Sequence, residues 1–197
     1  MLLFLNKPSH LRDTEKVNMK KILALLALSL IATTASAHGP TPQKVEKTIT
    51  IKGDPAKVWA LVKDFGNMQK WHPAVATDQV SQKKDENGEM ATYRALALKG
   101  GGVINEKLRN IDETAMKLKY EIVDSPLPLT DYNSTITVAK GDVAGETTVT
   151  WVGRFYRLYK LNPPIPAGQD DATAVAAVTG VYDAGLANLK KVVESSK

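Results

Sequence analysis

The stretch from Asp171 to Glu194 is the feature that most constrains the fold of this chain. Its larger apolar residues recur at the spacing of one helix face, at Val175, Val178, Tyr182, Leu186, Leu189 and Val193. Asp170 and Asp171 stand where side-chain oxygens are expected to accept from the free N–H groups that begin a helix. Since the chain before this helix reads mainly as strands, the sequence predicts a sheet that covers one long helix.

Seven segments alternate apolar and polar residues and predict strands. They are residues 45–51, 75–83, 89–99, 103–110, 116–123, 132–140 and 146–158. Between the first two strands, Asp54 and Pro55 are typical of a helix start and predict a short helix over 56–65. A second short helix is expected at about 68–71. We therefore expect an α+β fold in which a curved, seven-stranded antiparallel sheet surrounds the C-terminal helix.

The first residues predict a leader. Lys20 and Lys21 precede the uncharged run 22–32, and Ala35-Ser36-Ala37 follows as a small-residue cleavage motif. The run is too short to span a membrane. We expect a signal peptide over 19–37 with cleavage after Ala37, Met19 as the true start, and 1–18 as an over-extended start. Residues 38–197 would then form one exported domain without a membrane span.

Charge and cysteine content exclude several classes of function. Residues 1–37 hold five of the 26 basic and two of the 21 acidic residues, so 38–197 has 21 and 19, a net charge of +2. This balance does not favour nucleic-acid binding. The absence of cysteine excludes disulfides, thiolate metal sites and a Cys nucleophile. With only His38 and His72 in the mature chain, we expect no metal site and no cofactor.

Strand parity places three polar residues on an otherwise apolar concave face. Arg94 shares a face with two leucines, Glu106 lies between Ile104 and Leu108, and Tyr120 alternates with further apolar residues. A turn that pairs 99 with 103 would put 96 opposite Glu106 and Arg94 diagonal to it. The next turn, around Asp112 and Glu113, would put Tyr120 opposite Glu106. The cluster is either a structural ion pair beneath a tyrosine or the polar anchor of a ligand cavity.

Further residues are expected near this cavity. Tyr132, Ser134 and Trp151 lie on inward parities, although Trp151 also fits a plain core position. Trp71 and His72 lie at a helix-to-strand corner where the cavity would open. A lone histidine is weak support for catalysis. A glutamate beside Arg94 is expected to stay ionised, which argues against Glu106 as a proton donor. No catalytic motif is present, so we expect a protein that is not an enzyme.

The end of the last strand is a candidate partner surface. Arg154, Tyr156 and Leu158 lie on its outward parity, and Arg157, Tyr159 and Lys160 follow. Exposed aromatic and arginine side chains are enriched at interfaces. The alternative is an ordinary solvated strand end.

These residues carry a resemblance to known families. The order of elements resembles the helix-grip superfamily of Bet v 1 and START-like (SRPBCC) proteins. The polyketide cyclase/dehydrase branch is suggested by Tyr93-Arg94, Gly100-Gly101-Gly102, Glu106-Lys107-Leu108-Arg109, Asp112, Tyr120-Glu121-Ile122, Pro126, Tyr132 and Trp151.

Several longer stretches resemble the MxaD-type accessory proteins of bacterial methanol oxidation more closely. They are Val58 to Phe65, Gln69 to Ala74, Gly153 to Arg157, Asn162 to Pro166, Tyr182 to Leu186 and the mature start His38-Gly39-Pro40. The resemblance implies a periplasmic protein that assists methanol dehydrogenase, most directly in its interaction with its c-type cytochrome. It gives no reason to place the quinone or the metal of that enzyme in this chain.

Three functions follow in order of preference. The first is a non-catalytic accessory protein that docks on methanol dehydrogenase or its cytochrome. The second is a carrier of a small hydrophobic ligand held near Arg94, Glu106 and Tyr120. The third is a cyclase- or dehydrase-like enzyme that uses Glu106 or His72 as acid or base. A fold at this level does not decide among them.

Overall fold

A computed structural model describes residues 39–196. The predicted leader at 19–37, the cleavage site after Ala37 and the over-extended start at 1–18 lie outside the described residues. The elements, in chain order, are β1 (Gln43–Lys52), α2 (Pro55–Val62), the 3-10 turn η1 (Met68–Lys70), β2 (Val75–Lys84), β3 (Met90–Leu98), β4 (Val103–Asp112), β5 (Lys117–Asp124), β6 (Leu129–Lys140), β7 (Glu146–Arg157) and α3 (Asp171–Ser195).

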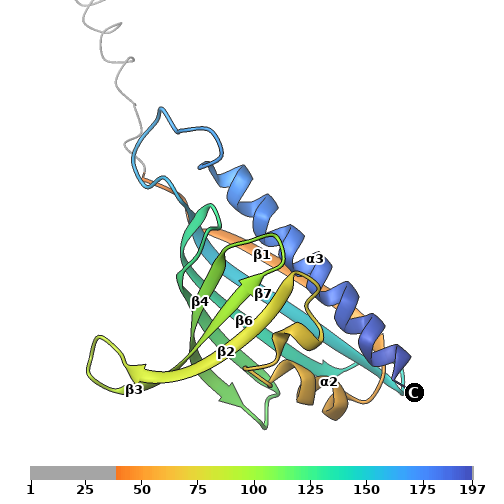
Figure 1. The fold of residues 1–197 in the computed structure, drawn as a ribbon. Coiled ribbons are helices and arrows are strands. Elements are labelled where there is room, and N and C mark those ends of the chain that lie inside the picture. The colour runs from red at the N-terminus through yellow and green to blue at the C-terminus, as the bar shows by residue number, and fades with distance from the viewer. Residues whose placement is uncertain (1–38, 197) are drawn as a thin grey trace, which may run out of the picture. The chain divides into compact units, whose positions relative to one another are not determined.

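The seven strands form one antiparallel sheet with the order β1-β7-β6-β5-β4-β3-β2. β1 and β2 follow each other in the chain but lie at opposite edges, because α2 and η1 connect them. The sheet curves, and α3 runs along its concave side, mainly against β1 and β7 (Figure 1). This arrangement confirms the predicted helix-grip fold.

The long helix forms where its apolar spacing predicts. The fully buried residues on its inner face are Ala174, Val178, Tyr182, Gly185, Leu186 and Leu189. Asp170 caps the helix, since its Oδ1 accepts from the Thr173 backbone N–H at 2.7 Å. The expectation for Asp171 is wrong, because its Oδ2 accepts from Arg157 at 3.0 Å instead. No helix within residues 39–196 combines the length and apolar character needed to cross a membrane.

The two short segments after β1 are shorter than predicted. Asp54 caps α2 by accepting from the Ala56 N–H at 2.6 Å, and Pro55 is the first helical residue, as expected. α2 ends at Val62 rather than at Phe65, whose carbonyl accepts from a side chain of β3. The second predicted helix is the single 3-10 turn η1.

The register between β3 and β4 differs from the prediction by two residues. Arg94 lies directly opposite Glu106, whereas the predicted register placed Leu96 there. The turn between these strands is longer than expected, and Gly101 and Gly102 both adopt positive φ within it. A shift of two residues keeps every side chain on its predicted face, so the two charges still meet.

A bulge in β4 changes the next register. Leu108 pairs with Tyr120 and Glu106 pairs with Ile122, so the predicted pairing of Glu106 with Tyr120 is wrong. Arg109 is the extra residue of the bulge, between Leu108 and Asn110. Bulges bend a strand and redirect the neighbouring side chains. Glu106 and Tyr120 nevertheless remain on the same concave face.

Candidate functional site

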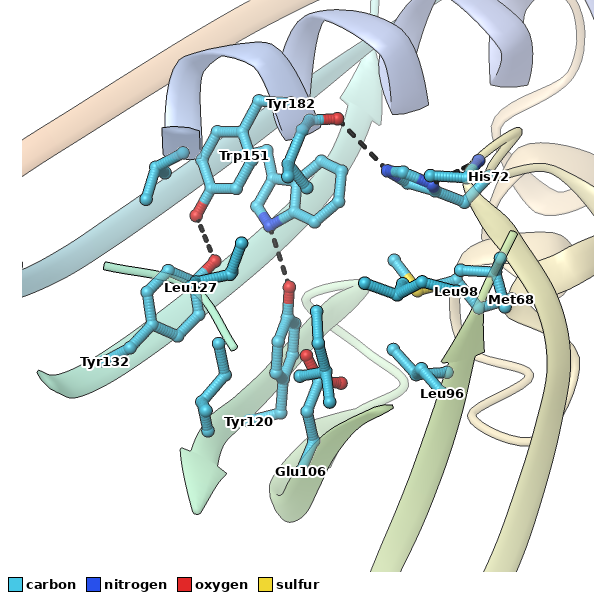
Figure 2. Close-up of a pocket in the computed structure, with 16 residues that line it drawn as sticks. Met68, His72, Leu96, Leu98, Glu106, Tyr120, Leu127, Tyr132, Trp151 and Tyr182 are labelled. Atoms are coloured by element: carbon cyan, nitrogen blue, oxygen red, sulfur yellow. Dashed lines mark hydrogen bonds between the residues drawn. The ribbon is translucent and has the colours of Figure 1, made fainter. Parts of the chain in front are cut away.

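A small cavity lies between the concave face of the sheet and α3 (Figure 2). Its volume is about 80 Å³. Its walls are mostly apolar and come from the segment after η1, from β3 to β7 and from α3. Ala74, Leu98, Leu127 and Val181 belong to the lining and are exposed or half-buried, so the cavity reaches the surface beside them.

Five of the seven predicted cavity residues line this space, namely His72, Glu106, Tyr120, Tyr132 and Trp151. The prediction is wrong for Arg94 and Trp71, which are buried but are not part of the lining. Arg94 lies behind Glu106, and Trp71 packs edge-on against Trp151 with ring centroids 5.7 Å apart.

Aromatic side chains occupy most of the space between sheet and helix. Trp151 stacks on Tyr182 of α3, with ring centroids 4.2 Å apart and planes 12° apart. The Trp151 Nε1–H points to the Tyr120 hydroxyl at 3.0 Å (Figure 2), and it also lies 2.8 Å from the Ser134 hydroxyl. The hydroxyls of Tyr132 and Tyr182 lie 2.5 Å apart. The polar atoms of this cluster therefore bind one another.

The tyrosines of this cluster are held in their neutral form. Burial is the main cause that raises the pKa of Tyr120, Tyr132 and Tyr182 above the ordinary value. Each hydroxyl keeps its proton at neutral pH and can donate a hydrogen bond. None of the three is suited to accept a proton as a phenolate.

Arg94 forms a buried cluster behind the cavity wall. Its Nε donates to Glu106 Oε2 at 2.6 Å and its Nη1 donates to the Phe65 carbonyl at 3.1 Å. The guanidinium lies 4.1 Å from the centroid of the Phe65 ring. Asp78 contributes a second carboxylate, with Oδ2 at 3.8 Å from Nη1. Within residues 39–196, Arg94 Nη2 and Asp78 Oδ1 have no hydrogen-bond partner.

Two acids thus share one cation in a buried place. Burial raises the pKa of Glu106, and the nearby Arg94 only partly opposes this. Burial likewise raises the pKa of Asp78. The pKa of Glu106 was expected to be held down by Arg94, but it is raised, because the loss of hydration outweighs the attraction of one shared guanidinium.

His72 joins the corner after η1 to the long helix. Its Nε2 lies 3.1 Å from the Val181 carbonyl oxygen, and its Nδ1 accepts from the Ala74 backbone N–H at 3.3 Å. These contacts fit a neutral ring with the proton on Nε2. Burial lowers the pKa of His72. The ring fits because α3 carries Gly185 here, where an added Cβ would lie 2.6 Å from His72 Cδ2.

Sequence reasoning missed two members of these clusters. Tyr182 was assigned to the helix face but not to the cavity, although it is the only aromatic residue between Asp171 and Ser195. That isolation was a usable signal. Asp78 gave none, since it is one polar residue in a strand whose remaining residues are mostly exposed.

Most residues of the predicted partner surface are accessible to solvent. Arg154 and Lys160 are exposed, and Tyr156 and Tyr159 are half-buried. Lys160 pairs with Asp131 at 2.7 Å.

The prediction is wrong for Arg157, which is only 5% exposed. The alternation of β7 turns Arg157 inward. Its guanidinium donates to the carbonyls of Tyr159 at 2.7 Å and Leu161 at 3.2 Å, and to Asp171 at 3.0 Å. Arg157 therefore fixes the segment that joins β7 to α3 and does not face a partner.

Metal binding has no visible basis in the described part of the chain. Within residues 39–196, no group of three or more His, Cys, Asp or Glu side chains is placed to hold a metal ion.

Comparison with known proteins places the chain among helix-grip proteins. A family model described as polyketide cyclase / dehydrase and lipid transport matches residues 42–194. No curated protein sequence matches the chain. The protein XoxI from Bacillus cereus has a solved structure with 27% identity and a TM-score of 0.61, covering 76% of this chain and 94% of its own.

Two further solved structures are similar. A putative uncharacterized protein from Bacillus thuringiensis shows 28% identity and a TM-score of 0.61, over 77% of this chain and 98% of its own. A START superfamily protein from Mycobacterium smegmatis shows 14% identity and a TM-score of 0.57, over 78% and 99% of the two chains. The second likeness concerns the fold alone.

Proposed function

The chain belongs to the polyketide cyclase/dehydrase and lipid transport family. We propose that, within this family, it is a non-catalytic accessory protein that acts through its outer surface. The observation that carries this proposal is the small cavity. Its volume of about 80 Å³ is well below the roughly 300–1,000 Å³ of pockets that hold drug-sized ligands. The stack of Trp151 on Tyr182 occupies space that a larger ligand would need.

The polar groups around the cavity also argue against catalysis. A general acid or base must reach its substrate and titrate near the working pH. His72 uses both ring nitrogens in contacts with the backbone. Glu106 has the raised pKa that a cyclase-like mechanism would use, but its Oε2 is held by Arg94. The other polar side chains of the cluster bind one another.

The proposed partner is methanol dehydrogenase, its c-type cytochrome, or both, in the periplasm. This choice rests on the resemblance to MxaD-type accessory proteins. The proposed contact surface consists of Arg154, Tyr156, Tyr159 and Lys160. Because Arg157 binds backbone carbonyls of the segment that follows β7, the backbone around Tyr159 and Lys160 loses little conformational entropy when a partner binds.

Electron transfer in the presence of the protein tests this function. Methanol dehydrogenase would reduce its cytochrome at increasing concentrations of the protein, and the initial rate would be recorded. We expect a saturable increase. The variant Arg154→Glu should weaken it, while Lys84→Glu, an equal charge change on the exposed part of β2, should not. No change in rate at any ratio would reject the accessory role.

A second candidate is a carrier of a very small apolar ligand. The cavity is lined by Leu96, Leu98, Ile104 and Val178, and its volume exceeds the roughly 10–15 Å³ that one water needs. Xenon, benzene and short-chain alcohols are suitable probes. A saturable rise in melting temperature, together with NMR shifts of the lining methyl groups, would support this function. Unchanged melting temperature and methyl spectra across all three probes would reject it.

A further inference from the structure

The outer face of the sheet, opposite α3, carries a hollow rich in positive charge. It has a volume of about 310 Å³ and lies over β4, β5, β6 and β7. Three long basic side chains, Arg109, Lys119 and Arg154, belong to its lining. Of these three, only Arg154 was predicted to belong to a partner surface. Arg109 and Lys119 lie on the consecutive strands β4 and β5, and the pairing of β5 with β6 and of β6 with β7 brings them to the same hollow as Arg154.

The sheet register explains why a hollow forms on this face. Lys119, Thr135 and Val152 are cross-strand neighbours in one row, and Glu121, Asn133 and Arg154 are cross-strand neighbours in the adjacent row. Asn133, Thr135 and Val152 have short side chains and form the floor. The long side chains stand at its sides, because opposite residues on one face of a sheet project in the same direction.

Two bulges border the hollow and direct its charges. Arg109 is the extra residue of the β4 bulge. In β6, the register shifts between Thr130 and Asn133, and Asp131 adopts a positive φ of 54°. Bulges redirect side chains and are common beside functional sites.

The charges of the hollow are largely unbalanced. Among residues 39–196, neither Lys119 nor Arg154 has an ion-pair partner, and no acidic residue belongs to the lining. Arg109 contacts Glu121 at a long 3.4 Å, and its side chain is 50% exposed. Three cations on one hollow repel one another, and that repulsion is relieved when negative groups bind between them.

We propose that this basic hollow, defined by Arg109, Lys119, Arg154, Asn133, Thr135 and Val152, docks carboxylate side chains on the surface of a partner protein. The inference rests on the proposed accessory function and names the chemistry of its partner, an acidic surface patch. The arginines offer paired N–H groups to a carboxylate, and the Asn133 amide and Thr135 hydroxyl offer further hydrogen bonds.

Neighbouring apolar residues favour a protein as the occupant. Tyr156 and Leu158 continue the outward side of β7 beyond Arg154, and Leu158 is exposed. An arginine-bearing surface with adjoining aromatic and aliphatic groups is typical of protein interfaces. The contacts form at an exposed surface, so their strength should fall steeply as the ionic strength rises.

The first experiment uses poly-L-glutamate as a carboxylate probe and does not depend on methanol dehydrogenase. The protein, purified from expression of the full chain, would be labelled with ¹⁵N and titrated at low and high salt. We expect amide shifts to gather around residues 109, 119, 133, 135 and 154, and to disappear at high salt. Shifts spread over all the lysines, or absent, would overturn the proposal.

Matched variants distinguish binding in the hollow from a general effect of net charge on the affinity for poly-L-glutamate. Lys119→Glu with Arg154→Glu should weaken the affinity for poly-L-glutamate at least tenfold. Lys84→Glu with Lys140→Glu makes the same change in net charge at exposed positions outside the hollow, and should leave the affinity within about twofold. Equal weakening in both pairs would overturn the proposal. The neutral pair Lys119→Gln with Arg154→Gln, checked by circular dichroism, repeats the comparison without added negative charge.

The second experiment tells this inference apart from the accessory function. Stimulation of electron transfer would be measured with the same variants. If wild-type protein stimulates and the hollow variant stimulates equally, the docking proposal is wrong and the accessory function stands. If wild-type protein does not stimulate, the accessory function is wrong, and the probe titration alone decides whether the hollow binds carboxylates.

Discussion

Replacing Arg94 with methionine is the sharpest test of how the buried cluster behind the cavity is held. The change keeps much of the side-chain length and apolar contact while it removes the guanidinium. Glu106 loses its hydrogen bond of 2.6 Å, and the Phe65 carbonyl loses its donor at 3.1 Å. Asp78, at 3.8 Å, loses the cation nearest to it.

The expected loss is large because both carboxylates stay buried. Removing one partner of a buried ion pair costs about 3–5 kcal/mol of unfolding free energy, since the remaining charge has no compensation. Here two acids are left instead of one, so we expect the upper half of that range at pH 7. Acid protonation limits the loss, because a buried carboxyl group can take up a proton instead of remaining charged.

The pH dependence of this loss follows from the direction of the pKa shifts. Glu106 and Asp78 have raised pKa values in the folded protein, from ordinary values of 4.5 and 3.8. An acid of this kind stabilises the fold most below its unfolded pKa, and this contribution is lost as pH rises through the folded pKa. Arg94→Met raises both values further. The difference from wild type should therefore be largest near pH 7 and shrink towards pH 4.5.

Urea unfolding monitored by tryptophan fluorescence at pH 7 and pH 4.5 measures this difference. Arg109→Met is the matched control, because its exposed contact with Glu121 should contribute no more than about 1 kcal/mol. A loss for Arg94→Met below 1 kcal/mol, or an equal loss at both pH values, would refute the reasoning. Either result would mean that the cluster is hydrated or carries no net charge at pH 7.

Three further predictions concern α3 and His72. Gly185→Ala should reduce the unfolding free energy by about 1–3 kcal/mol, because the added Cβ would press on the His72 ring. Gly180→Ala, where the added Cβ meets open space on the same helix, should increase it by about 0.5–1 kcal/mol. Urea unfolding of the two variants should therefore show changes of opposite sign. Asp170→Ala removes the helix cap and should lower the melting temperature by about 2–4 °C; an unchanged value in calorimetry contradicts it. NMR titration of His72 should give a pKa below 6.5. Its contribution to stability is complete above pH 6.5 and lost as pH falls below it; a pKa at or above 6.5 refutes the proposed burial.

Side-chain parity was the part of the fold that sequence predicted best. Arg94, Glu106 and Tyr120 share the concave face as expected, although both strand registers differ from prediction. Between β3 and β4, and between β4 and β5 beyond the Arg109 bulge, the register differs from the prediction by two residues, and an even shift preserves the face of every side chain. Turn length was not readable in the same way, since it depends on the positive φ of Gly101 and Gly102.

The errors at the candidate site arise where long-range partners decide. Arg157 lies on the inward parity of β7, between the outward Tyr156 and Leu158, but the groups that it binds come from the next loop and from α3. The volume of the cavity could not be predicted from the sequence either, because it depends on how Trp151 and Tyr182 stack between the sheet and α3. The sequence pattern indicates which face of the sheet or helix a side chain occupies, whereas the volume left empty between the two layers is set by how the side chains pack.

The pairing of β1 with β7 determines when this chain can fold. Gln43 pairs with Phe155, and Lys52 pairs with Glu146, so the partners are about 90 to 110 residues apart in the chain. Contacts between residues this distant form only after a long loop has closed, which costs conformational entropy, and they therefore slow folding. β1 is the first strand to be synthesised and almost the last to be paired. The molecule therefore stays incomplete until β7 emerges, and the concave face stays uncovered until α3 follows, so folding is completed from the C-terminal end.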